Sequence, residues 1–108
     1  MGTAATAPAR VSRWLARLPC VLKAHGVEAA YVFGSYARND ADADSDVDLM
    51  IVAPSRRPFT DRFRDYRNVW LGAPTGVDRL IYAPDEFDEQ RRSNRFVRHV
   101  LRHARRLV

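Results

Sequence analysis

The sequence predicts a small α/β domain in which a mixed sheet of three to four strands is flanked by helices. Three segments have the length and the β-branched and aromatic content of strands, and they are residues 27–33, 46–53 and 77–82. Between and around them, apolar residues recur at spacings of three and four, as in an amphipathic helix. A chain of 108 residues can bury one modest core. We therefore expect one domain over residues 10–108. Residues 1–9, whose side chains are mostly small and all uncharged, should form a disordered lead-in.

The first helix is expected between the lead-in and Gly26, which is a typical helix stop. Its apolar stripe consists of Val11, Trp14, Leu15, Leu18, Val21 and Leu22. Pro19 interrupts the spacing and can kink the helix. The lone cysteine, Cys20, excludes an intramolecular disulfide and a Cys-based zinc site, and we expect it to fill a buried apolar position.

A turn follows the first strand and leads into a short helix over residues 34–38, and a polar connection over residues 39–45 then reaches the second strand. Side chains alternate along a strand, so Asp46, Asp48 and Met50 should face one side of the sheet. The apolar side chains between them should face the other side, and these are Val47, Leu49 and Ile51.

Residues 59–71 have the spacing of a helix of about three turns, with Arg62, Arg64 and Arg67 on or beside its solvent-facing side. Mixed arginine and aromatic side chains can also stack on nucleic acid bases, but packing of this helix against the sheet is the favoured interpretation. After the third strand, Asp85 is a plausible N-cap of a last helical region.

The helix of residues 59–71 is long enough for a crossover connection, so the second and third strands should be parallel neighbours that begin at the same edge of the sheet. The first strand reaches the second through a compact connection, so it should run antiparallel and end at that same edge. Residues 105–108 could add a short edge strand. This topology gathers Asp46, Asp48 and Asp78 beside the turn that follows the first strand.

Carboxylates grouped in this way suit hard divalent cations, and two-metal phosphoryl or nucleotidyl transfer is the chemistry that they favour. Asp46 and Asp48 would bridge Mg²⁺ ions that neutralise the triphosphate of a nucleotide. Asp78 would share the catalytic metal, and as a general base it would help to deprotonate the attacking hydroxyl.

The turn would bind the phosphates. Gly34 and Ser35 offer a backbone free of side chain and a hydroxyl to an anion, and Arg38 could add complementary charge. Each of these features also has an ordinary structural explanation, because Asp-x-Asp is common on surfaces and Gly-Ser is a common turn. Their joint placement at three strand ends favours the functional interpretation.

The charge of the chain favours anionic partners. The formal net charge is +5, and Lys23 is the only lysine among the 18 basic residues. No segment approaches the length and hydrophobicity of a membrane span, and no signal-peptide pattern opens the chain. A cytoplasmic location is therefore the expectation.

The Gly34-Ser35 pair, ten intervening residues and Asp46-Val47-Asp48 together resemble the signature of the DNA polymerase beta nucleotidyltransferase superfamily. The spacing and the short chain are similar to its minimal nucleotidyltransferases, over residues 27–82. Residues 94–101 also resemble the closing helix of that family. Many relatives have Gly where this chain has Asn39, which tolerates the left-handed conformation that such a turn uses.

The resemblance implies a polymerase beta-like α/β core, a nucleoside triphosphate donor such as ATP, bound Mg²⁺ and a third carboxylate, for which Asp78 is placed. Many minimal members are encoded beside a HEPN-domain ribonuclease toxin. They act as antitoxins that bind the toxin in a hetero-oligomer and transfer AMP onto one of its tyrosines.

Three hypotheses follow. The favoured one is a Mg²⁺-dependent nucleotidyltransferase that transfers AMP from ATP onto a partner protein. The alternative is a non-catalytic antitoxin that neutralises its toxin by binding alone. A small nucleic-acid-binding domain ranks last, because the arginines are spread over several helices without a recognised nucleic-acid motif.

Overall fold

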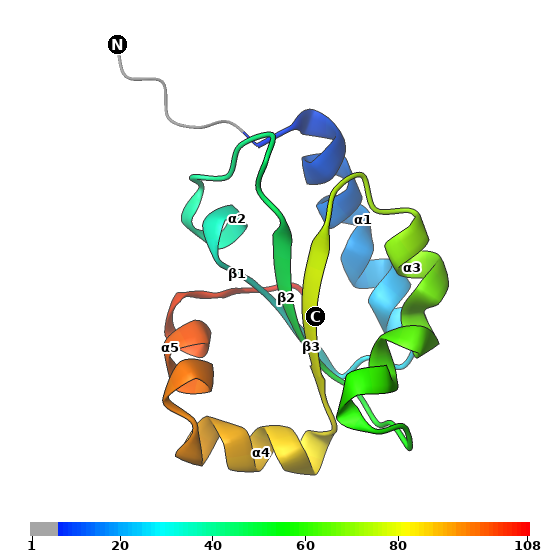
Figure 1. Cartoon of the computed structure of the whole chain (residues 1–108), viewed down its shortest axis with the longest axis vertical. Helices are drawn as coiled ribbons and strands as arrows, with labels where there is room; N and C mark the ends of the chain where they lie inside the picture. The colour runs from blue at the N-terminus through cyan, green and yellow to red at the C-terminus, as the bar shows by residue number, and fades with distance from the viewer. Residues whose placement is uncertain (1–6) are drawn as a thin grey trace.

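The structure is a computed structural model that describes residues 7–108, so most of the predicted lead-in lies outside the described residues. It contains one sheet with the strand order β3-β2-β1-β4 (Figure 1). The strands are β1 (Ala29–Phe33), β2 (Val47–Val52), β3 (Val77–Tyr82) and β4 (Arg105–Arg106). β2 is antiparallel to β1 and parallel to β3, and β4 pairs antiparallel with β1. The predicted mixed α/β sheet and its strand directions are confirmed.

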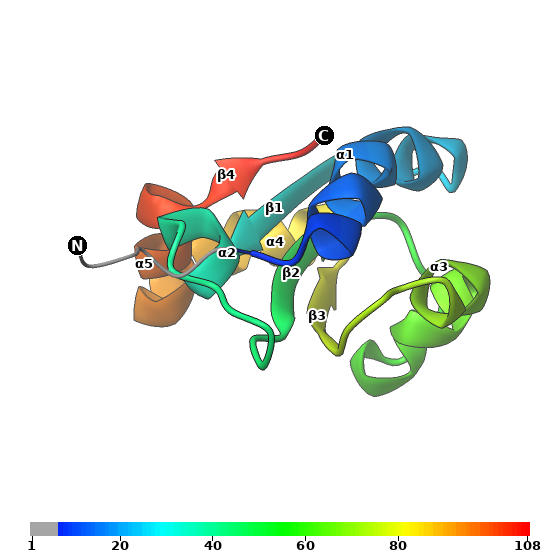
Figure 2. The same cartoon turned by 90° about the horizontal axis from the view of Figure 1, so that it is seen from above.

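Helices cover both faces of the sheet (Figure 2). On one face lie α1 (Ala9–Ala24), the 3₁₀ helix η1 (Phe59–Tyr66) and α3 (Arg67–Leu71), and on the other lie α4 (Pro84–Ser93) and α5 (Arg95–His103). The short helix α2 (Ser35–Arg38) follows β1. No helix of the described chain is long and apolar enough to cross a lipid bilayer.

The alternation predicted for the second strand is confirmed. Val47, Leu49 and Ile51 belong to the larger apolar cluster, together with the buried stripe of α1. Met50 faces the other way, into a smaller cluster with Val97 of α5. Since Asp48 is two positions from Met50, its side chain starts on the face that α4 and α5 cover.

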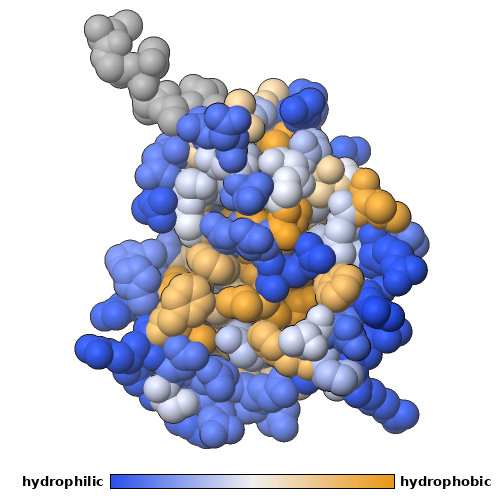
Figure 3. All heavy atoms as spheres, viewed as in Figure 1, coloured by the Kyte–Doolittle hydropathy of each residue, from blue (hydrophilic) through white to orange (hydrophobic). Residues whose placement is uncertain are grey.

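The face under α4 and α5 is only partly covered. Four apolar side chains of the strands on this face stay half-buried, and they are Tyr31, Phe33, Leu80 and Tyr82. The space-filling view shows apolar surface gathered between α4, α5 and the strands (Figure 3). This face therefore has an accessible apolar floor next to the strand ends that carry the predicted carboxylates.

The prediction that residues 59–71 are helical is confirmed, but the prediction that Arg62 lies on or beside the solvent-facing side of that helix is wrong. Residues 59–66 form a 3₁₀ helix before α3, and Arg62 is buried, with 6% of its surface exposed. Its guanidinium donates to the carbonyl oxygens of Arg57 at 3.0 Å and Ile81 at 3.1 Å and is paired with the Glu86 carboxylate. These acceptors compensate for the loss of water around the buried cation.

Two further predictions are corrected. Cys20 is exposed, because it lies on the side of α1 away from the buried Leu18 and Leu22. Asp85 is not an N-cap, since α4 begins at Pro84. The backbone N–H of Ala83 instead donates to Oε1 of Glu86 at 2.8 Å, so a carboxylate of the first turn caps this helix.

Candidate active site

Asp48 and Asp78 lie side by side on neighbouring strands. They are register partners in the parallel pair of β2 and β3, and adjacent strands are about 4.8 Å apart. Asp78 shares its face of the sheet with Leu80 and Asp48 shares it with Met50, and both apolar residues belong to the cluster under α4 and α5. The predicted pairing of these two carboxylates at one edge is therefore present.

Gly34 brings the backbone of the turn against the Asp48 carboxylate. Phe33, the last residue of β1, is the register partner of Asp48, so the turn starts beside it. Gly34 has a φ of +72°, and a Cβ atom at this position would overlap Oδ2 of Asp48. Only glycine allows both the backbone conformation and the close approach.

The Asp46 carboxylate likewise lies close against the backbone of a glycine, Gly76. Asp46 directly precedes β2, and a Cβ atom on Gly76 would overlap its carboxylate. The N–H of Val47 donates to the carbonyl oxygen of Gly76 at 2.9 Å, and Oγ1 of Thr75 donates to that of Ser45 at 3.2 Å. The segments that lead into β2 and β3 are thereby held together, with Asp46 between them.

The electrostatics show that the carboxylates are close enough to interact. Partial burial raises the pKa of Asp48, and the negative charges of Asp78 and Asp46 raise it further, while the charge of Arg38 lowers it. Arg38 also pairs with Asp40 at 3.1 Å on the surface. A cluster of like charges favours the protonated acid unless cations offset it.

The three carboxylates have the chemistry of a Mg²⁺ site, but their side chains do not converge on one point. Within residues 7–108, no three His, Cys, Asp or Glu side chains lie closely enough together to enclose a metal ion. Mutual repulsion favours separated carboxylates, and aspartate side chains can rotate toward a shared cation. Oxygen donors on adjacent strands fit a hard divalent cation, so Asp46, Asp48 and Asp78 are the residues that would hold it.

The turn after β1 carries the residues predicted to bind phosphate. Ser35 begins α2, and the N–H groups of Ala37 and Arg38 donate to the carbonyl oxygen of Gly34, each at 3.1 Å. Asn39 ends the helix in the left-handed conformation with a φ of 62°, as its residue type allows. The turn therefore keeps the short helix that the sequence predicted.

Comparison with known proteins places this arrangement in a family. The model of the nucleotidyltransferase domain family matches residues 18–105. The chain belongs to this family. It is a nucleotidyltransferase, and its fold is that of the minimal nucleotidyltransferases.

Three relatives illustrate the likeness. The "putative protein adenylyltransferase" of Methanocaldococcus jannaschii is 50% identical over 47 residues, which are 44% of this chain and half of that protein. A structure described as a "putative minimal nucleotidyltransferase" is 30% identical, with a TM-score of 0.59, over 87% of this chain and 88% of its own. The fold is shared by a structure described as a "toxin-antitoxin with AMP-PNP", which is 18% identical and has a TM-score of 0.61. The match covers 87% of this chain and 72% of that one.

Side chains of α5 also lie beside the turn that carries Gly34 and Arg38. A hollow of about 410 Å³ lies beside the phosphate turn, lined by Phe33, Gly34, Arg38, Phe96, His99, Val100 and His103. Phe33 and Phe96 meet edge to face, with ring centroids 6.1 Å apart. Four of these residues come from α5, about sixty positions after the turn, and the only pointer to this region was the resemblance of residues 94–101 to the closing helix of the family.

Tyr36, which directly follows Ser35, belongs to the larger apolar cluster. Its side chain is buried, and its hydroxyl has no hydrogen-bond partner among the described residues. Burial raises the pKa of Tyr36, and the charges of Asp42 and Asp46 raise it further. The sequence analysis did not single out Tyr36, whose only notable feature there was its position directly after Gly34-Ser35.

Proposed function

We propose that this nucleotidyltransferase transfers AMP from ATP onto a hydroxyl group of a partner protein with the help of Mg²⁺. We further propose that it is the cytoplasmic antitoxin of a HEPN-type ribonuclease toxin. The observation that carries the proposal is the pairing of Asp48 with Asp78 in register, with Gly34 packed against Asp48. The adenylyltransferase name of one relative and the toxin-antitoxin complex of a fold neighbour, with its ATP analogue, support the choice of substrates.

Asp46, Asp48 and Asp78 would hold the cation. Bound there, Mg²⁺ would neutralise charge on the triphosphate and lower the pKa of the attacking hydroxyl. The repulsion that raises the pKa of Asp48 would then be offset. The carboxylates thus contribute a site whose negative charge matches the cation.

Gly34, Ser35 and Arg38 would bind the β- and γ-phosphates. Because Gly34 lacks a side chain, the Asp48 carboxylate and the cation that it would hold can lie against the turn that binds the phosphates. The Ser35 hydroxyl can donate to a phosphate oxygen, and the Arg38 guanidinium adds positive charge at the rim of the hollow beside the turn.

In the transfer, the hydroxyl oxygen of the acceptor bonds to the α-phosphorus of ATP. The bond from that phosphorus to the oxygen bridging to the β-phosphorus breaks, pyrophosphate leaves, and the proton of the hydroxyl passes to the Asp78 carboxylate. Asp78 is exposed on the edge strand β3. An acceptor can therefore reach this carboxylate from the open edge of the sheet.

The test is transfer onto the protein encoded by the neighbouring open reading frame, which we expect to be a HEPN-domain protein. That protein is incubated with the purified chain, Mg²⁺ and each nucleoside triphosphate in turn, and its intact mass is measured. We expect a gain of one AMP with ATP, and its loss in Asp48→Asn and Asp78→Asn. Asp44→Asn is the matched control, because Asp44 is an exposed acid of the connection before β2. Undiminished transfer by Asp48→Asn would refute the catalytic assignment.

The same variants separate catalysis from binding alone. If this protein acts by transfer, Asp48→Asn should fail to neutralise the toxin in cells although it still binds it. Full neutralisation by Asp48→Asn would instead favour an antitoxin that works by contact.

A further inference from the structure

The last nineteen residues of the chain concentrate its positive charge. Residues 90–108 contain seven arginines and no Asp or Glu, whereas residues 1–89 contain 11 basic and 13 acidic side chains. The seven are Arg91, Arg92, Arg95, Arg98, Arg102, Arg105 and Arg106. The positive net charge of the whole chain therefore originates in the end of α4, in α5 and in β4.

These seven arginines have no acidic partner within the described residues. The ion pairs of residues 7–108 use other arginines, and they are Arg38, Arg57, Arg62 and Arg64. All seven arginines of the C-terminal segment are exposed. Like charges held together on a rigid surface create a positive potential that attracts an anionic partner.

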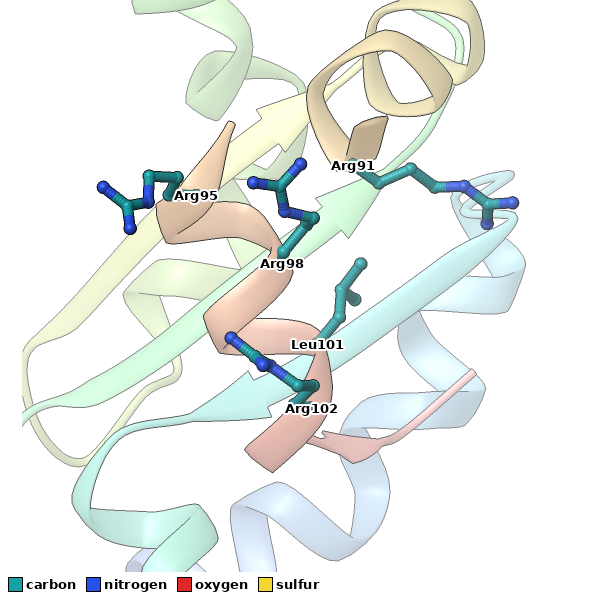
Figure 4. Close-up of a pocket in the computed structure, with 5 residues that line it drawn as sticks. All are labelled: Arg91, Arg95, Arg98, Leu101 and Arg102. Atoms are coloured by element: carbon teal, nitrogen blue, oxygen red, sulfur yellow. The ribbon is translucent and has the colours of Figure 1, made fainter. Parts of the chain in front are cut away.

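Four of these arginines surround one hollow. This hollow, which we call the arginine hollow, has a volume of about 550 Å³. It is lined by Arg91, Arg95, Arg98, Leu101 and Arg102. Figure 4 shows the four guanidinium groups spread around α5 and the end of α4, with Leu101 among them. Nη1 of Arg98 donates to the carbonyl oxygen of Arg92 at 2.6 Å, which ties α5 to the end of α4.

The arginine spacing repeats along one side of α5. Arg95, Arg98 and Arg102 are at positions i, i+3 and i+7, so they lie on one side of the helix over two turns. Carboxylates at the same spacing on an opposing helix would face them. Leu101 packs in part against the apolar cluster under α4 and α5, and its remaining exposed surface is an apolar contact that a leucine or similar side chain of a protein could meet.

We propose that the arginine hollow is the docking surface for a partner protein that presents an acidic amphipathic helix. Such a helix places carboxylates against the arginines and an apolar side chain against Leu101. A nucleic-acid backbone would pair with the arginines but would leave the exposed part of Leu101 uncovered by apolar atoms. Arginine also suits protein interfaces, because its guanidinium is weakly hydrated and binds carboxylates with two parallel hydrogen bonds.

The test measures binding of a fluorescein-labelled synthetic helix that carries Glu at i, i+3 and i+7 around one Leu. The variant is the triple change Arg91→Gln, Arg95→Gln and Arg102→Gln, which keeps Arg98 and its bond to the end of α4. The matched control is the triple change of Arg10, Arg13 and Arg17 to Gln. Those arginines are exposed on α1 with spacing i, i+3 and i+7, and the net charge falls equally.

We expect fluorescence anisotropy at physiological salt to show the α4–α5 triple variant at least about tenfold weaker than wild type, the scale of several exposed charge pairs acting together. The α1 triple variant should stay within about twofold. Replacing Leu101 with Asn should also weaken binding, and circular dichroism should show every variant folded.

Several results would overturn the proposal. These are no binding of the acidic helix by wild type, equal weakening in both triple variants, or tighter binding of a 20-nucleotide single-stranded RNA that the α4–α5 triple variant loses. The inference is independent of the transferase proposal, since Asp48→Asn leaves the arginine hollow intact. Binding of the acidic helix by Asp48→Asn therefore tests the docking proposal, and AMP transfer by the same variant tests the transferase proposal.

Discussion

Asp48 is the residue at which stability and function oppose each other. Its pKa is raised by partial burial, by Asp78 and by Asp46. A raised pKa in the folded state means that Asp48 favours folding below its unfolded pKa of about 3.9. This contribution is lost as the pH rises through the folded pKa, so at neutral pH the ionised carboxylate destabilises the fold.

We predict that Asp48→Asn raises the melting temperature at pH 7 by a few degrees, because the amide removes the charge and keeps the shape. Near pH 3 the wild-type acid is also neutral, so the gain should disappear. Differential scanning calorimetry at the two pH values measures it. A lower melting temperature at pH 7 would show that Asp48 is not under electrostatic strain.

Gly34 allows a comparison with a second glycine that has a positive φ. Gly34 and Gly26 both have positive φ, at +72° and +81°, but only Gly34 has a carboxylate where a Cβ would stand. We predict that Gly34→Ala and Gly26→Ala each lose about 1–2 kcal/mol of unfolding free energy from backbone strain.

Only Gly34→Ala should also displace the Asp48 carboxylate. We expect it to lower the rate of AMP transfer at least about tenfold, the scale of a misplaced catalytic group, while Gly26→Ala keeps it. Urea unfolding and intact-mass kinetics measure the two effects. Equal transfer rates in the two variants would mean that the contact between Gly34 and Asp48 has no functional role.

At the scale of elements, one ion pair joins η1, β3 and α4. Buried Arg62 bonds both to the Ile81 carbonyl in β3 and to Glu86 in α4, and Glu86 also accepts the Ala83 N–H. These bonds lower the pKa of Glu86, the one from Arg62 most. A lowered pKa favours folding above the unfolded pKa of about 4.3, and this stability is lost as the pH falls through the folded pKa.

We predict that Glu86→Ala loses about 1–3 kcal/mol of unfolding free energy at pH 7, because it leaves a buried guanidinium without its carboxylate and α4 without its cap. The value stays modest because the Glu86 side chain is 41% exposed and water can replace part of the contact. Urea unfolding at pH 7 and at pH 3 should show a smaller difference at pH 3. Glu89→Ala, an exposed change in the same helix, is the control.

At the scale of the whole molecule, residues 105–108 cover one edge of the sheet. β4 pairs with the outer edge of β1, and the Leu107 N–H donates to the carbonyl oxygen of Ala30 at 2.7 Å. Leu107 and Val108 pack against the larger apolar cluster. Without this segment, the edge of β1 would expose unpaired backbone groups that can pair with another chain.

We predict that a chain ending at Ala104 is less stable and associates at micromolar concentration through its free β1 edge. Light scattering after size-exclusion chromatography measures the association. The double change Arg105→Gln and Arg106→Gln is the control, since it keeps the backbone pairing and should stay monomeric or unchanged in size. A monomeric, equally stable truncated chain would contradict the role of β4.

Residues close in sequence determined much of the fold and the site. The alternation in 46–52, the glycine after β1 and the length of the crossover before β3 are local properties. They were sufficient to predict the mixed sheet, the faces of β2 and the pairing of Asp48 with Asp78. The left-handed Asn39 also followed from its residue type.

Only the tertiary structure decided which distant residues meet. Arg62 can be buried because Glu86 and Ile81 accept its hydrogen bonds from other elements. The Asp46 carboxylate lies where a side chain of Gly76 would stand. Helix α5 brings aromatic and histidine side chains to the turn after β1. Strand and helix periods report one face of one element, whereas these contacts depend on how elements far apart in the chain pack together. For that physical reason the carboxylates and the turn beside them could be predicted from the sequence, and the contacts that come from distant elements could not.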